Sequence, residues 1–299
     1  MKPVHRHKYF VSMRSIKKLK ARIQLLAFTA IFTTGCTEMA AEPETAATLK
    51  NVPYSDVSSL PARNPDGWLK YGDDPVQFIL QWEPQLSAKG LLILIHGGCW
   101  LNSFDVDHIR ALASALATEG YAVFAVEYRR TGDEGGGWPG TLADITAALD
   151  TIVDHTGSTD AILIGHSAGG HLALHAARRQ PASVKAVIGM AAITDLSSYA
   201  SGSNSCQSAA VDFMGGTQTQ HPTAYEAAGL ADKILHPRSI LLHGEADGIV
   251  DIDQARLEGA ATHIEPGAGH FDWIHPGTAA FSTLLVKLDE LVRVQNTLF

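Results

Sequence analysis

The sequence is poor in cysteine and lacks the common metal and nucleotide motifs. Only three of its 299 residues are cysteine, and its 14 histidines form no HExxH pair. No GxxxxGKS or GxxxxGKT stretch is present, and the glycine-rich residues 131–140 include acidic side chains where a phosphate site would need free amides and a lysine. We therefore expect neither a metal site nor a cofactor.

Basic residues are scarce after the N-terminal segment. Residues 1–35 hold eight of the 23 basic residues and none of the 31 acidic ones, so the remaining chain has 15 basic residues and a formal net charge of about −16. No basic run with interleaved aromatic residues follows Arg22, which excludes a nucleic-acid partner. The composition, 45% apolar and 18% charged, is that of a globular protein with a sizeable core.

The first 35 residues have the pattern of an export signal. Their basic region leads into an apolar run at residues 23–32, which is too short to span a bilayer but suits the core of a signal peptide. The run leads to Thr33-Thr34-Gly35-Cys36, which resembles a bacterial lipobox, although Thr33 stands where leucine is usual. That resemblance implies cleavage before Cys36 and acylation of this cysteine, which would anchor the protein to a membrane.

Two forms of export follow from this segment. A lipoprotein would lie in the bacterial periplasm or at the outer membrane, and Thr37 in the second position resembles a signal for the outer membrane. The alternative is an ordinary secretory peptide cut near Ala40 or Ala41, which would give a soluble secreted protein. Translation from Met1 and translation from Met13 both predict export.

The rest of the chain divides into a tether and one domain. Residues 36–65 are predicted to be a flexible tether and residues 66–299 to form the folded domain. If Cys36 is acylated, Cys99 and Cys206 remain as a pair in an oxidising compartment, where a disulfide can join them. Two separate buried thiols are the alternative.

The stretch at residues 161–170 predicts a nucleophilic serine. Four apolar residues run into Gly165-His166-Ser167-Ala168-Gly169, and a helix-forming run follows, so the pattern is strand, turn and helix. A side chain at either glycine would collide where the chain doubles back, which leaves Ser167 at the apex. The amide of Ala168 would then point to where negative charge develops on an attacked carbonyl group.

Apolar strands and amphipathic helices precede this turn. The expected elements are an antiparallel edge strand at residues 75–82, buried strands at 91–95 and 123–126, and helices at 105–120 and 141–155. The loop His96-Gly97-Gly98-Cys99-Trp100 follows the first buried strand. Its glycines would let the amides of Gly98 and Cys99 complete an oxyanion hole with Ala168.

The order of these motifs resembles the α/β-hydrolase fold. The histidine-glycine-glycine-aromatic loop follows one strand, Glu127-Tyr128-Arg129-Arg130 follows the next, and the serine turn follows the third. The resemblance is to the small esterase and kynurenine-formamidase-like branch, close to the hormone-sensitive lipases, and covers residues 66–295. It implies a doubly wound, mostly parallel sheet flanked by helices, with catalytic residues in the order serine, acid, histidine.

The acid and the base are predicted to follow the last two strands. A buried strand at residues 239–243 leads into a turn that resembles the family's HGxxDxxV pattern, which places Asp247 in the acid position. His270 follows a strand at residues 261–265, in a loop from which it can reach the serine.

Four nearby titratable residues are expected to be structural. Asp251 and Asp253 suit the cap and first turn of a helix that runs through Leu257. His263 lies inside a predicted strand, and His275 precedes the final helix.

Residues 197–237 are predicted to form a small cap over the serine, because a polar segment rich in glycine and serine replaces an ordinary crossover. Trp100, Trp138 and Phe271 are candidates for an apolar wall of the substrate pocket. Packing of these aromatic residues in the core is the alternative.

Together these features predict a serine hydrolase that cleaves small carboxylic esters through an acyl-enzyme. An arylformamidase acting on formylkynurenine-type amides is an alternative, but the export signal argues against that cytoplasmic role. A small peptidase and a non-catalytic binding module are weaker alternatives, since a peptide-selecting domain is absent and the predicted triad is complete. The oligomeric state is not predicted.

Overall fold

The computed structural model describes residues 49–293. The predicted signal peptide, with Cys36 and the first part of the predicted tether, lies outside the described residues. Within residues 49–293, no helix is both long and apolar enough to cross a membrane.

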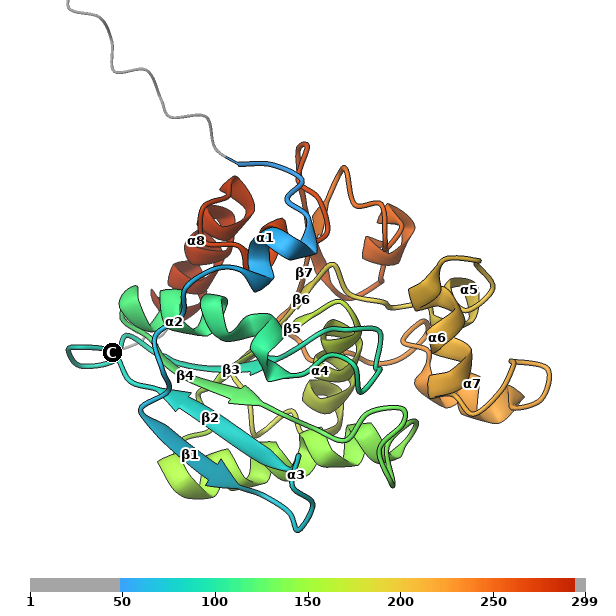
Figure 1. The fold of residues 1–299 in the computed structure, drawn as a ribbon, viewed down its shortest axis with the longest axis horizontal. Helices are drawn as coiled ribbons and strands as arrows, with labels where there is room; N and C mark the ends of the chain where they lie inside the picture. The colour runs from blue at the N-terminus through green and yellow to red at the C-terminus, as the bar shows by residue number, and fades with distance from the viewer. Residues whose placement is uncertain (1–48, 294–299) are drawn as a thin grey trace, which may run out of the picture. The chain divides into compact units, whose positions relative to one another are not determined.

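An eight-stranded sheet forms the centre of the described part of the chain (Figure 1). Its order is β1-β2-β4-β3-β5-β6-β7-β8, and β2 pairs antiparallel with both β1 and β4, whereas all later pairs are parallel. The strands are β1 (Gly67–Lys70), β2 (Phe78–Trp82), β3 (Leu91–Ile95), β4 (Ala122–Val126), β5 (Ile162–His166), β6 (Ala186–Met190), β7 (Ser239–Gly244) and β8 (Ala261–Glu265). The predicted doubly wound, mostly parallel sheet is confirmed.

The predicted edge strand is wrong in its position. Residues 74–77 form a turn, with Gln77 N donating to Asp74 O at 3.0 Å, so β2 begins only at Phe78. The edge is β1, a four-residue strand whose Trp68 side is exposed. Such a short, half-buried strand gives little apolar periodicity in the sequence.

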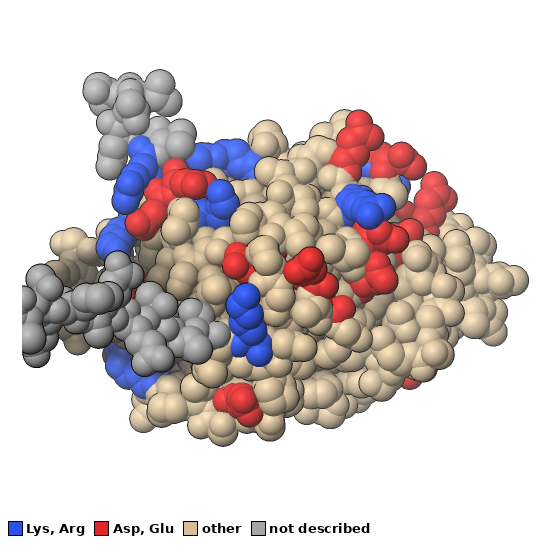
Figure 2. Space-filling view, turned by 90° about the horizontal axis from the view of Figure 1, so that it is seen from above, with Lys and Arg blue, Asp and Glu red and all other residues tan. Residues whose placement is uncertain are grey.

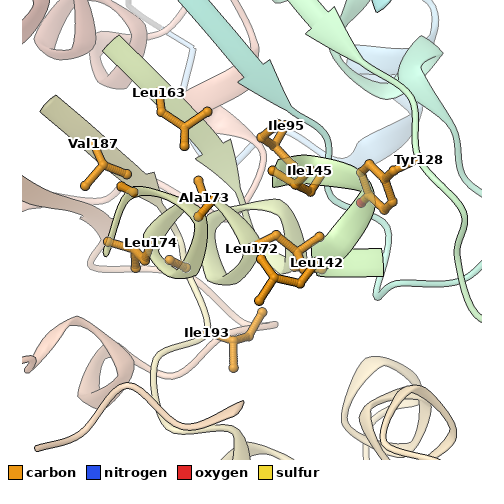
Figure 3. Packing of buried hydrophobic residues seen from close by; sticks show 14 of the residues in the cluster. Ile95, Tyr128, Leu142, Ile145, Leu163, Leu172, Ala173, Leu174, Val187 and Ile193 are labelled. Carbon is orange, nitrogen blue, oxygen red and sulfur yellow. The ribbon is translucent and has the colours of Figure 1, made fainter. Parts of the chain in front are cut away.

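Helices cover both faces of the sheet. The main ones are α2 (Arg110–Thr118), α3 (Gly140–Thr156), α4 (Ala168–Arg179) and α8 (Ala279–Arg293). Leu92 and Leu94 of β3 share a core with α2 and α8, whereas Ile93 and Ile95 face a second core that α3 and α4 complete (Figures 1 and 3). Alternate residues of one buried strand therefore hold both helix layers.

Two predicted helices differ in their ends. The helix expected at residues 105–120 starts as a 3-10 turn, η1 (Val106–Ile109), which Asp105 caps by accepting a hydrogen bond from Asp107 N at 3.0 Å. Helix α3 spans one residue more at each end than expected and stops at Gly157, whose φ of 66° is left-handed.

The cap segment contains three short helices, α5 (Leu196–Tyr199), α6 (Ser205–Phe213) and α7 (Pro222–Ala228), grouped beside the sheet in Figure 1. Helix α6 begins with a capping box, in which Asn204 and Gln207 exchange hydrogen bonds. Cys206, in its first turn, forms a disulfide with Cys99, and the two Cα atoms lie 5.0 Å apart. The cap is thus joined covalently to the glycine loop after β3.

The predicted tether is wrong from residue 49 onward. Asn51 N and Val52 N both donate to the carboxylate of buried Asp272, each at 2.7 Å. Helix α1 (Tyr54–Ser58) follows, and Val52 and Val57 are buried. The polar composition of residues 36–65 concealed these two apolar anchors, because composition averages over the segment. We call residues 49–58 the N-terminal strap.

Candidate active site

Ser167 occupies a sharp turn between β5 and α4. Its φ of 56° and ψ of −120° lie outside the usual regions for a residue with a side chain. Ser167 N donates to Met190 O at 2.8 Å, which fixes the turn against β6. A Cβ on Gly165 would lie 2.1 Å from Gly169 O, so the close approach of the two glycines makes the turn possible.

Asp247 and His270 form a buried pair. His270 Nδ1 lies 2.8 Å from Asp247 Oδ2, while Oδ1 accepts hydrogen bonds from Ile249 N and Val250 N at 2.8 and 2.9 Å. Burial raises the pKa of Asp247, but the hydrogen bond and charge of His270, together with the two amides, outweigh it and hold the pKa below its usual value. An ionised Asp247 keeps the proton of His270 on Nδ1 and leaves Nε2 as an acceptor.

The rival carboxylates serve a helix end. Asp251 caps η2 (Ile252–Ala255) by accepting from Asp253 N at 2.8 Å, and Asp253 pairs with exposed Arg256 at 3.2 Å. Because η2 ends at Ala255, it is shorter than the helix predicted to run through Leu257.

His263 and His275, which were expected to be structural, also have local partners. His263 contacts Glu265 at 3.0 Å on the same strand, and the His275 ring accepts a hydrogen bond from Gly277 N.

Ser167 and His270 line one cavity of about 200 Å³. Its other walls are mostly apolar and come from the N-terminal strap, the glycine loop and the segment that follows it into η1, the first turn of α6, and the loops after β7 and β8. These residues are Tyr54, Gly98, Cys99, Phe104, His108, Cys206, Ile249 and Phe271. The nucleophile and the histidine of the Asp247 pair thus share a small apolar space.

Phe271 lines this cavity, but Trp100 and Trp138 do not. Trp100 is 1% exposed and stacks on Phe213 of α6 at 4.7 Å, and Trp138 packs edge-on against His175 at 5.3 Å. Cys99 and Trp100 both have positive φ, and this twist leaves Cys99 in the cavity wall and Trp100 in the core below the cap. The assignment of Trp100 and Trp138 to the pocket is therefore wrong: Trp100 packs on Phe213 and Trp138 packs on His175, both outside the cavity.

The glycine loop lies directly against the nucleophile. A Cβ on Gly97 would stand 3.2 Å from Ser167 Cβ and 2.9 Å from His166 O. Gly98 and Cys99 face the cavity, and Ala168 is the first residue of α4, where an amide has no acceptor within its own helix. The arrangement suits a set of backbone donors for an oxyanion.

Sequence reasoning missed two buried histidines behind His270. His166 Nε2 lies 3.0 Å from the His270 carbonyl oxygen, and His166 Nδ1 lies 3.0 Å from His108 Nε2. Burial, with the charge of His270, lowers the pKa of His166 to about 3, and burial lowers that of His108 well below its usual value. Both rings are therefore neutral near pH 7. His166 directly precedes Ser167 in the sequence, and this position could have indicated its role.

Glu127 is a further missed residue. Its buried carboxylate accepts hydrogen bonds from Val106 N at 2.7 Å and Tyr128 N at 3.0 Å, and it pairs with His96 at 3.1 Å and Arg130 at 3.0 Å. Glu127 thereby holds His96, the first residue of the glycine loop. Its place in the Glu-Tyr-Arg-Arg motif could have indicated this role.

Among the described residues, no group of three or more histidine, cysteine or acidic side chains could hold a metal ion. The site combines a serine, a histidine–aspartate pair and nearby backbone amides around an apolar space.

The family profile named BD-FAE matches residues 82–259, more than half of the chain. The chain belongs to the BD-FAE family. The matched range includes Ser167 and Asp247, while His270 and the N-terminal strap lie beyond its ends. No match was found among curated proteins.

Several solved structures are similar to this BD-FAE chain. Esterase B from Lactobacillus rhamnosis HN001 is 22% identical, with 82% of this chain and 92% of that chain covered and a TM-score of 0.66. EstE7, a hormone-sensitive-lipase homologue from a metagenome library, is 15% identical, with coverage of 80% and 91% and a TM-score of 0.62. A truncated carbohydrate esterase from gut microbiota is 18% identical, with coverage of 77% and 97% and a TM-score of 0.60. This likeness confirms the predicted α/β-hydrolase fold.

Proposed function

We propose that the protein is a serine hydrolase that cleaves carboxylic esters of small molecules. The observation that carries this proposal is the shared cavity: strained Ser167 and the His270 of a buried Asp247–His270 pair line the same apolar space. Nucleophilic catalysis needs a serine hydroxyl near a base. Strained backbone of the kind seen at Ser167 is common at active sites.

In the proposed reaction, Ser167 Oγ attacks the ester carbonyl carbon while His270 Nε2 accepts the hydroxyl proton. The amides of Gly98, Cys99 and Ala168 donate to the oxyanion. The C–O bond then breaks, His270 returns the proton to the departing alcohol, and an acyl-enzyme remains. Water attacks the acyl-enzyme with its proton going to His270, and that proton returns to Ser167 as the acid leaves.

An ester fits this site better than a peptide or a formamide. The cavity is small and mostly apolar, and its walls include no carboxylate, lysine or arginine side chain that could bind a charged peptide terminus or an amino acid group. The names of the similar solved structures, an esterase and a carbohydrate esterase among them, support the same reaction.

Replacement of the nucleophile tests the proposal. Ser167→Ala should lower kcat on p-nitrophenyl butyrate on the order of 10⁴-fold or more and abolish labelling by a fluorophosphonate probe. Ser201→Ala, in the exposed cap, is the matched control and should retain both. Labelling of Ser167→Ala equal to that of the wild type, or an unchanged rate, would overturn the proposal.

Substrate comparison separates the ester from the amide readings. The wild type should prefer acetyl and butyryl esters over N-formylkynurenine and an aminoacyl anilide in kcat/KM. A tenfold preference for the formamide, about 1.4 kcal/mol in transition-state free energy, would assign the protein to the arylformamidases instead.

We also propose that the protein is an exported lipoprotein, with Cys36 as the acylated residue. The Cys99–Cys206 disulfide supports an oxidising compartment. In a bacterial host, the wild type should fractionate with membranes, and Cys36→Ala should accumulate unprocessed or be released. Normal cleavage of Cys36→Ala to a soluble protein would favour the ordinary signal peptide, whereas retention of the wild type in the cytoplasm would contradict export.

A further inference from the structure

The N-terminal strap packs on the loop that carries His270. The Asp272 carboxylate, which accepts the strap amides of Asn51 and Val52, lies two residues after His270 and is 1% exposed. A Cβ on Gly269 would lie 2.2 Å from Asn51 Oδ1, so strap and loop are in direct contact. The strap therefore has a defined position beside the catalytic base.

Tyr54 brings the strap into the catalytic cavity. Its ring lies 5.4 Å from both His108 and Phe271 and 5.8 Å from Phe104, measured between ring centroids. All four residues line the cavity that Ser167 and His270 share. Within residues 49–293 the Tyr54 hydroxyl forms no hydrogen bond, so its contribution to the wall comes from the ring.

The side chains behind Tyr54 are held in place. His108, on which Tyr54 stacks, lies 3.0 Å from His166, and His166 contacts the His270 carbonyl oxygen at 3.0 Å. The His270 carbonyl can only accept, so His166 Nε2 donates to it, and a neutral His166 then accepts at Nδ1 from His108. The side chains around Tyr54 are thus connected through His108 and His166 to the backbone of His270, and these contacts restrict their movement.

We propose that Tyr54 is a specificity-determining residue, whose ring closes the cavity and limits the size of the apolar group beside the scissile ester. This inference rests on the proposed esterase function. It assigns part of the substrate site to a segment that precedes the family match at residue 82. The ligand chemistry is an unbranched or small aromatic apolar group, which either the acyl or the alcohol half of the ester can supply.

The test compares three substitutions in the full chain. If the acyl group lies beside Tyr54, Tyr54→Ala should raise kcat/KM for p-nitrophenyl octanoate, relative to p-nitrophenyl acetate, by about tenfold or more, because several additional methylenes can enter the cavity. Tyr54→Trp should shift the ratio in the opposite direction. Tyr54→Phe, which keeps the ring, should leave the ratio within about twofold of the wild type.

A second substrate series identifies the half of the ester that enters. Acetyl esters of ethanol, butanol and octanol vary only the alcohol, so a gain confined to this series in Tyr54→Ala would place the alcohol beside Tyr54. A gain confined to the acyl series would place the acyl group there.

Unchanged ratios in both series for Tyr54→Ala and Tyr54→Trp, with wild-type fluorophosphonate labelling retained, would overturn the inference but leave the esterase proposal intact. Absence of ester hydrolysis by the wild type would instead overturn the proposed function.

Discussion

At the scale of single residues, the site depends on side chains that keep one protonation state. Asp247 accepts three hydrogen bonds, from His270 and from two backbone amides, and all three donors favour its charged form. His166, on the other side of His270, is held neutral by burial, which lowers its pKa to about 3. Asp247 thus holds the His270 ring at Nδ1, while His166 donates to the His270 backbone carbonyl, so that both the ring and the backbone of His270 are held in place.

The identity of the acid gives a residue-scale prediction. Asp247→Asn should lower kcat on the order of 10⁴-fold, because an amide that donates to His270 Nδ1 would stabilise the wrong tautomer. Asp251→Asn is the matched control and should change kcat by less than about threefold, since Asp251 only caps η2. The measurement is kcat on p-nitrophenyl butyrate at pH 8. A larger loss in Asp251→Asn would show that the acid was chosen wrongly.

At the scale of elements, the central strands other than β6, and the turns after them, were predictable from the sequence. Strands β3 and β4 are continuous apolar runs and β5 begins with one, and the glycines at 165 and 169 are needed because a Cβ at either would strike backbone atoms. Asp247 and His270 could be predicted because each follows a predicted strand, and the carboxyl ends of parallel strands meet at one edge. Local sequence therefore carried most of the catalytic geometry.

The N-terminal strap and the cavity walls could not be predicted in the same way. The strap is held by Asp272, whose partners Asn51 and Val52 lie more than 200 residues earlier in the chain. Trp100 leaves the cavity because two successive residues adopt positive φ, which no sequence pattern requires of Cys99 and Trp100. Long-range contacts and unusual backbone angles decide these features, and neither has a periodic signature.

The disulfide gives the cap its connection to the site. Cys99 belongs to the loop that faces Ser167, and Cys206 lies in the first turn of α6. Both cysteines line the cavity, so the covalent link is also part of the substrate wall. Below it, Trp100 stacks on Phe213 of the same helix, which adds a noncovalent contact between loop and cap.

At the scale of the whole molecule, acidic residues outnumber basic ones, 31 to 23. On the face shown in Figure 2, acidic side chains gather toward the upper right, whereas most basic side chains lie toward the left end. The full chain has a formal net charge of −8 with its 14 histidines counted as neutral. Acidification therefore changes the total charge mainly through carboxylates and those histidines that can accept a proton.

Buried histidines predict how stability responds to that acidification. Burial lowers the pKa of His166 to about 3, of His171 to about 4 and of His175 to about 2. An unfolded chain restores each to about 6.5, so the unfolded state binds more protons below this pH. The contribution of these histidines to the free energy of unfolding should therefore be complete above about pH 6.5. It should fall as the pH drops toward 4, by about 1.4 kcal/mol per pH unit for each histidine.

His175→Gln tests this linkage, because glutamine does not titrate and can still donate a hydrogen bond to Ala228 O, which His175 Nε2 contacts at 2.8 Å. Urea unfolding at pH 7, 6, 5 and 4 should show a slope of free energy against pH that is smaller than that of the wild type by about 1.4 kcal/mol per pH unit. His155→Gln, at an exposed position on α3, is the control and should keep the wild-type slope, because the replaced side chain is not buried. Equal slopes for His175→Gln and the wild type would mean that His175 is protonated in the folded protein, with its Nδ1, which has no partner among the described residues, reached by water.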